Sequence, residues 1–110
     1  MDTSNRISFH EATVVSFTRD NTTVRLKLDG VLVGKKTSQI TLTVSQVINV
    51  TVDGKRSGIP LMESNDGEVL SLDILKDGLS IIIEWNDFAR GTSFTRSYRV
   101  HGQLDPATIV

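Results

Sequence analysis

Residues 84–91, Glu-Trp-Asn-Asp-Phe-Ala-Arg-Gly, hold the densest group of side chains that could do chemistry. Trp and Arg are enriched at the energetic centres of interfaces, and loops on a rigid scaffold often carry function. We therefore predict that Trp85, Asp87, Phe88 and Arg90 bind a partner. The structural alternative is that Trp85 covers the core, Asp87 caps a turn and Arg90 closes the loop, since a lone Trp is usually well buried.

Arg96 is a further candidate binding residue. In a strand it shares its parity with Phe94 and Tyr98, so its charge points to an apolar side and needs a partner or a route to water. We expect Glu84 or Glu68 to pair with it, or its guanidinium to reach water at a sheet rim. The functional alternative is that Arg96 binds an anion or an acidic side chain of a partner.

His10 and Glu11 are the residues most suited to acid–base chemistry. Adjacent residues of a strand point to opposite faces, so we expect a polar pair near a strand start and no shared site. The sequence contains no Gly-rich phosphate loop, no Gly-x-Ser-x-Gly elbow and no His-Glu-x-x-His motif. We therefore predict that the protein is not an enzyme.

Metal chemistry has equally little support. Asp66, Glu68 and Asp73 do not have the alternating oxygen ligands of a calcium loop. The two histidines, His10 and His101, would form a site only if the first and last strands were neighbours, which barrel closure would allow. Cysteine is absent, so no thiolate is available. We predict no metal and no cofactor.

Composition indicates one soluble domain over residues 1–110, with 38% hydrophobic and 23% charged residues. The net charge is −1, and the nearest approach to a basic patch is Lys35-Lys36, so we expect no nucleic-acid partner. No apolar run approaches the roughly 20 residues of a membrane span. The absence of cysteine and of a secretory signal pattern leads us to expect a cytoplasmic protein.

The chain repeats a two-residue hydrophobic period, which is typical of β-strands with one buried face. The clearest case is residues 39–53, where alternate positions are apolar. A Gly inside a strand often marks a bulge, and we expect one at Asp29-Gly30. We predict six strands, over residues 7–18, 22–33, 39–53, 68–75, 79–86 and 92–101. Residues 54–67 are expected to be a loop with room for one helical turn.

The fold class that follows is all-β: a single antiparallel sheet of about six strands, closed or folded into a barrel or a sandwich, with little helix. In the last hairpin we expect Trp85 opposite Thr92, and we expect residues 81–83 to be covered on both faces. The residues predicted to face inward are Val24, Leu26, Leu28, Ile40, Leu42, Val44, Ile48, Val50, Val52, Leu70, Leu72, Ile74, Ile81 and Ile83.

Two stretches carry a resemblance to known proteins. Residues 9–17, Phe-His-Glu-Ala-Thr-Val-Val-Ser-Phe, resemble the opening strand of small bacterial β-proteins grouped with toxin-neutralising immunity proteins. The hairpin over residues 84–99 is similar to closing hairpins of uncharacterised bacterial families. The resemblance implies a non-catalytic protein that binds another protein, and we carry over no functional residue from it.

The leading functional hypothesis is a protein-binding module, in particular an immunity protein that masks a toxin. The alternative is a small-ligand binder or small enzyme that uses the interior or mouth of a β-barrel. That alternative requires His10, Glu84, Arg96 and His101 to meet in one pocket. We also expect a homodimer, because the Thr-rich face of residues 39–53 is flat and open strand edges offer unpaired backbone groups.

Overall fold

The computed structural model describes residues 7–56, 61–105 and 108–109. In this part of the chain no residue is helical, and the prediction of an antiparallel all-β fold is confirmed. The nine strands of the described chain are β1 (Ile7–Ser8), β2 (Thr13–Asp20), β3 (Thr23–Val33), β4 (Lys36–Val52), β5 (Lys55–Arg56), β6 (Gly67–Leu75), β7 (Gly78–Asp87), β8 (Thr92–Leu104) and β9 (Thr108–Ile109).

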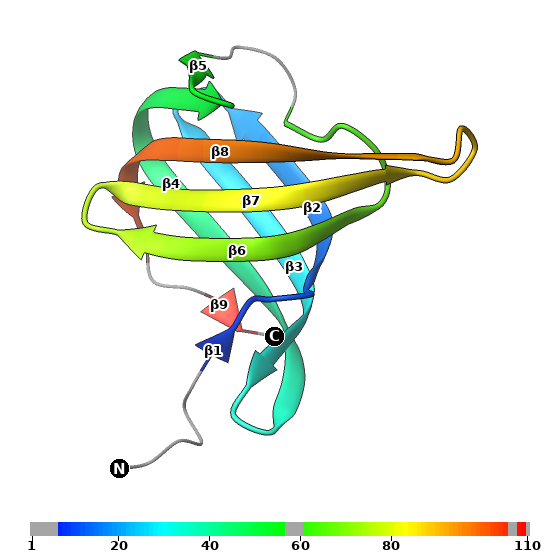
Figure 1. Ribbon diagram of the computed structural model, residues 1–110. Coiled ribbons are helices and arrows are strands. Elements are labelled where there is room, and N and C mark those ends of the chain that lie inside the picture. Colours follow the sequence, from blue (N-terminus) through cyan, green and yellow to red (C-terminus); the bar gives the residue numbers. More distant parts are fainter. Residues whose placement is uncertain (1–6, 57–60, 106–107, 110) are drawn as a thin grey trace.

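Six of these strands close into a ring, in the order β2, β3, β4, β8, β7, β6 and back to β2 (Figure 1). Two three-stranded meanders, β2–β4 and β6–β8, lie across each other as the two sides of the ring. Strands β4 and β8 join them through six residue pairs. On the other side of the ring, strands β2 and β6 join the two meanders through one residue pair, Thr13 and Glu68. Two backbone hydrogen bonds of Val69, with Glu11 and Ala12, lie next to this pair. The fold is therefore a barrel with one narrow seam.

The interior of the ring is filled by apolar side chains, as expected for a small barrel. No polar or charged residue is buried among the described residues. The buried set is Ala12, Val14, Phe17, Val24, Leu26, Leu28, Val31, Ile40, Leu42, Val44, Val47, Val50, Leu61, Val69, Leu79, Ile81, Ile83, Trp85, Tyr98 and Val100.

Strand β3 follows its prediction closely. Its alternate residues Val24, Leu26 and Leu28 are buried, and its pairing with β4 shifts between Leu28 and Val31. Gly30 lies at that shift with a φ of 72°, a backbone conformation that glycine adopts without strain. The predicted bulge is confirmed, and it re-aims the strand so that Val31 also faces the core.

Strand β4 keeps its predicted parity up to Val44 and recovers it at Val50, which is buried, and at Val52, which packs against the core. Gln46 has a φ of 51°, and the pairing with β8 is shifted between Ser45 and Asn49. This irregularity turns Val47 into the core, at 4% exposure, and leaves Ile48 82% exposed. The prediction that Ile48 faces inward is therefore wrong, because the irregularity interrupts the alternation.

Strand β6 contains a second irregularity that the sequence did not reveal. Its pairing with β7 shifts between Val69 and Ser71, so the alternation changes phase there. Val69 is buried, while Leu70 and Leu72 are only half-buried and Ile74 is 51% exposed. The prediction that Ile74 faces inward is therefore wrong, and Leu70 and Leu72 are less buried than predicted.

Strand β7 lies between β6 and β8, as predicted for a central strand. Ile81 and Ile83 are buried, but Ile82 on the outer face is only half-buried, so coverage on both faces is wrong. The pairing with β8 sets Trp85 opposite Phe94, two residues from the predicted partner Thr92. A shift of two residues preserves the faces, and it arises because pairing continues to the end of β7.

The predicted first strand is split into β1 and β2. Glu11 has a φ of 68°, and the amide of Ala12 bonds the carbonyl of Phe9 at 3.1 Å, which closes a turn. No Gly, Pro, Asn or Asp announces this turn. The predicted helical turn in the 54–67 loop is absent from residues 54–56 and 61–66, and residues 57–60 lie outside the described part.

We predict that Leu42→Ala lowers the free energy of unfolding by about 2–5 kcal/mol, because a buried leucine is replaced by a cavity. Leu42 is 2% exposed. Ile48→Ala on the same strand is the matched control, and it should cost no more than about 0.5 kcal/mol. Urea denaturation of both variants measures this difference. Equal costs at the two positions would contradict the placement of the two side chains.

Candidate functional site

Trp85 lies inside the barrel and not on its surface. Its side chain is fully buried, and its ring faces Gly67 on β6. A Cβ added at Gly67 would lie 2.5 Å from the ring, so this glycine leaves the space that the tryptophan fills. The indole Nε1 donates a hydrogen bond of 2.7 Å to the hydroxyl of Tyr98. Trp85 is therefore a core residue, as the structural alternative in the sequence analysis had it, and its side chain is not on the surface.

Tyr98 connects this buried pair to the loop that follows β5. Its hydroxyl donates to the carbonyl of Leu61 at 3.2 Å, and the Leu61 side chain is itself buried. Its ring also packs edge-on against Phe17, at 5.1 Å between centroids. Burial raises the pKa of Tyr98 to about 12, so the hydroxyl keeps its proton to higher pH than an exposed tyrosine would.

Residues 61–66 are also held from the surface side. The carbonyl of Asp66 accepts the amide of Asn86 at 2.9 Å, and its carboxylate accepts the Asn86 side-chain amide at 3.1 Å. The Ser64 hydroxyl accepts the amide of Asp66 at 3.0 Å and donates to its carbonyl at 2.9 Å. This segment is thus fixed against the end of β7.

Arg96 completes the attachment of the loop. Its guanidinium bonds Asp53 at 3.1 Å and Glu63 at 3.4 Å, and it lies over the ring of Phe94 at 4.9 Å from the centroid. Desolvation alone would lower the pKa of Arg96, but the bonds and charges of the two carboxylates outweigh it, and the net shift is upward.

The expected partners of Arg96 are wrong. Glu68 and Glu84 oppose each other across β6 and β7, and each lies on the opposite parity from the buried Val69 and Ile83 beside it. The observed partners come from the β4–β5 turn and from the loop, which are 43 and 33 residues away in sequence. The expectation that Arg96 reaches the rim is correct, because its side chain is 38% exposed.

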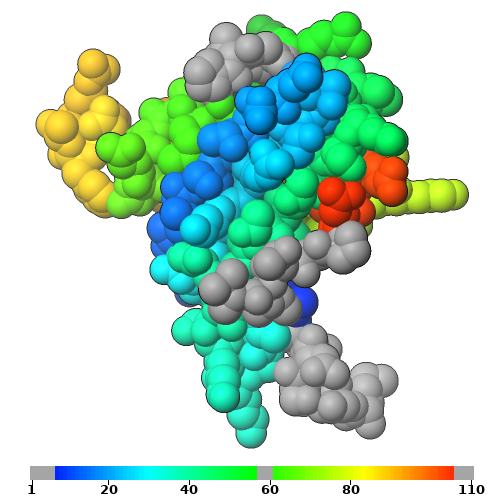
Figure 2. Space-filling view, turned by 180° about the vertical axis from the view of Figure 1, so that it is seen from behind, coloured from blue at the N-terminus to red at the C-terminus, as the bar shows by residue number. Residues whose placement is uncertain are grey.

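The tip of the β7–β8 hairpin projects away from the barrel (Figure 1). Seen from behind, it is the yellow and orange lobe that stands clear of the body (Figure 2). Asp87 caps the turn, since its carboxylate accepts the amide of Arg90 at 3.2 Å and lies 3.7 Å from the guanidinium. The Arg90 side chain is 82% exposed, and Phe88 is 78% exposed. Of the residues predicted to bind a partner, these three share the tip.

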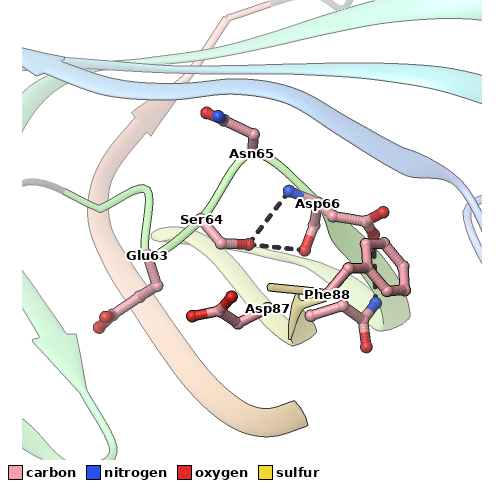
Figure 3. Close-up of a pocket in the computed structure, with 7 residues that line it drawn as sticks. Glu63, Ser64, Asn65, Asp66, Asp87 and Phe88 are labelled. Atoms are coloured by element: carbon pink, nitrogen blue, oxygen red, sulfur yellow. Dashed lines mark hydrogen bonds between the residues drawn. The ribbon is translucent and has the colours of Figure 1, made fainter. Parts of the chain in front are cut away.

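A groove of about 360 Å³ lies beside this tip (Figure 3). Residues 63–66 of the loop form one side, and residues 86–88 at the end of β7 form the other. Its lining includes three carboxylates, Glu63, Asp66 and Asp87, together with the ring of Phe88, and no Lys or Arg. Of these side chains, the sequence pattern predicted only Asp87 and Phe88 to bind a partner. It missed Glu63 and Asp66, because the loop has no hydrophobic periodicity from which their positions could be inferred.

His10 and Glu11 do lie side by side, contrary to expectation. The left-handed backbone at Glu11 breaks the strand alternation, and His10 Nε2 lies 3.8 Å from the carboxylate. Both side chains are exposed, at 64% and 74%, and the other ring nitrogen lies 3.0 Å from the Leu70 carbonyl. The pair is a surface contact with no enclosing pocket around it.

The described residues do not gather the groups that the barrel-mouth alternative needs. His101 contacts Asp77 at 3.5 Å, His10 contacts Glu11, and Arg96 contacts Asp53 and Glu63. Within residues 7–56, 61–105 and 108–109, no three His, Asp or Glu side chains are grouped to hold a metal ion. The same part of the chain contains no helix with the length and apolarity to cross a membrane.

Comparison with known proteins adds no further information about the site. No family model, no curated protein and no solved structure matches this chain.

We predict that Tyr98 titrates near pH 12 in the folded protein, against about 10 for the unfolded chain. Between these values the folded state retains a proton that the unfolded state has lost, so stability present below pH 10 declines toward pH 12. Tyr98 is the only tyrosine, so tyrosinate absorbance with and without urea reports it directly. A native midpoint near 10 would show that the hydroxyl is not enclosed.

Proposed function

We propose that this protein is a non-catalytic protein-binding module whose contact surface is the tip of the β7–β8 hairpin. The observation that carries the proposal is the 78% exposure of Phe88 at that tip. A large aromatic side chain left in water, next to an arginine, is the combination that interface centres favour. The hairpin frame holds its ends in the sheet, so the tip is presented in a defined position.

The filled barrel supports this proposal over the small-ligand or enzyme alternative. A ligand inside the ring would need a cavity with a few convergent polar groups. Apolar side chains occupy that space, and no described polar side chain is buried there. Trp85, one of the predicted binding residues, belongs to this interior, and we assign it the role of supporting the hairpin from beneath. Arg96 supports the loop in the same indirect way.

The more specific proposal is an immunity protein that masks a toxin in the cytoplasm. Its support is the resemblance of residues 9–17 to the opening strand of small bacterial β-proteins grouped with toxin-neutralising immunity proteins. A toxin gene next to the gene for this chain would support it, and neutralisation of that toxin on co-expression would establish it. A neighbouring metabolic operon would favour the small-ligand alternative instead.

We propose self-association as a separate property, at the edge of β6. The ring pairs β6 with β2 only at Glu68, so Ser71–Leu75 has no strand partner on its outer side within the described chain. Ile74 is 51% exposed there, while the charge of Asp73 on the same edge opposes unrestrained pairing. Light scattering tests this proposal, and a species of 12.1 kDa alone at high concentration would reject it.

Site-specific photocrosslinking tests the hairpin surface directly. A benzoylphenylalanine is placed at position 88, and in a matched control at position 48, which is also exposed and apolar and lies away from the β6 edge. In native cells, the probe at position 88 should form a discrete protein adduct that the control lacks. Adducts at neither position, or equal adducts at both, would reject the tip as a specific contact surface.

With the crosslinked partner purified, we predict that Phe88→Ala weakens its binding by at least about 1 kcal/mol, the usual threshold for an interface contributor. The free energy of unfolding should change by no more than about 0.5 kcal/mol, because the ring is exposed. Calorimetric titration and thermal unfolding measure the two effects, with Ile48→Ala as control, because Ile48 is 82% exposed and lies outside the proposed contact surfaces. A large stability loss would show that Phe88 belongs to the core.

A further inference from the structure

We propose that the groove beside Phe88 receives an arginine side chain of the partner protein, with its guanidinium between Asp66 and Asp87 and against the Phe88 ring. This inference rests on the proposed function and specifies the chemistry of the partner. The groove combines three carboxylates with an exposed aromatic ring and has no cation in its lining. That combination attracts a flat cation through charge-assisted bonds and through the face of the ring.

Elsewhere in the protein, the same combination of residue types, two carboxylates and a phenylalanine ring, holds an arginine. Arg96 lies between Asp53 and Glu63, at 3.1 and 3.4 Å, and over the Phe94 ring at 4.9 Å. Glu63 also lines the groove, so this cluster and the groove adjoin each other. In the groove, Asp66, Asp87 and Phe88 provide two carboxylates and one ring, and the nearby Arg90 contacts Asp87 without lining the groove.

Among the residues that the structure describes, no Lys or Arg lines the groove. Arg90 is the nearest candidate, but it lies 3.7 Å from Asp87 with its side chain 82% exposed, as a weak contact at the tip. Glu63 is already bonded to Arg96. Asp66 forms no ion pair with any Lys, Arg or His of the described residues, and its carboxylate accepts a hydrogen bond from the neutral amide of Asn86.

Size and shape favour arginine over larger ligands. A groove of about 360 Å³ lies near the lower end of the range for small-molecule sites, which suits one long side chain. A guanidinium offers a planar fork of donors that can satisfy two carboxylates and still lie flat on a ring. A lysine ammonium is a point charge without this plane, so it makes weaker use of Phe88.

The test is a titration followed by amide NMR shifts, with blocked arginine (N-acetyl-arginine methylamide) as the probe. The matched control is the citrulline analogue, which has nearly the same shape and no charge. We expect arginine to shift the amides of residues 64–66 and 86–88, and citrulline to leave them unchanged. Arginine shifting none of these amides at about 50 mM, a concentration suited to weak millimolar binding, would overturn the proposal. So would equal binding of citrulline, or lysine binding as tight as arginine.

Two substitutions remove charge from the groove while retaining the contacts of its walls. In Asp66→Asn and Asp87→Asn, the retained side-chain oxygen can still accept the bonds from Asn86 and Arg90. The double variant should bind the probe about tenfold more weakly, the size expected for lost charge-assisted bonds. Asp73→Asn, an exposed carboxylate on β6, is the control and should bind as the wild type does. An unaffected double variant would overturn the assignment.

The outcomes separate this inference from the proposed function. Crosslinks at position 88 without arginine binding would leave the protein-binding module intact and reject the arginine. Arginine binding without crosslinks would support the chemistry of the groove and reject the hairpin tip as the contact with a protein.

Discussion

The hydrogen bond between Trp85 and Tyr98 connects the interior of the barrel to the loop that lines the groove. It lies in a fully apolar core, where an unpaired indole N–H would be costly, so the hydroxyl of Tyr98 is held in one position. From that position the hydroxyl donates to the carbonyl of Leu61 and holds the loop at that residue. Gly67 makes the arrangement possible, because any side chain there would displace the Trp85 ring.

The loop positioned in this way forms one wall of the groove, and the end of β7 forms the other. Arg96 adds a second attachment through Glu63, and Asn86 adds a third through Asp66. Two of the three carboxylates of the groove, Glu63 and Asp66, are therefore presented by a segment that is bonded to the core and to the hairpin. This rigidity distinguishes the groove from the hairpin tip itself, where Phe88 is exposed and only the Asp87 cap orders the turn.

The sequence was sufficient for the fold class and for much of the core, because β3 and the first half of β4 alternate without interruption. It failed at Gln46 and at Leu70, where irregularities occur without the Gly or Asn that usually marks them. The sequence pattern correctly predicted that Phe88 is not a core residue, because Phe88 lies beyond the end of a strand. It did not find the partners of Arg96, since contacts across 33 and 43 residues depend on how the ring closes.

Hydrogen exchange in Tyr98→Phe tests the link between core and loop most directly. If the Tyr98 hydroxyl holds the loop in place, its removal should reduce the exchange protection of the amides of Asp66 and Asn86, which bond within the groove wall. The comparison is with core amides such as that of Leu26. The loss should be about tenfold or more, as expected when a bond worth roughly 1–3 kcal/mol is removed. If Asp66 and Asn86 keep their protection relative to Leu26, the loop does not depend on Tyr98 and the account is contradicted.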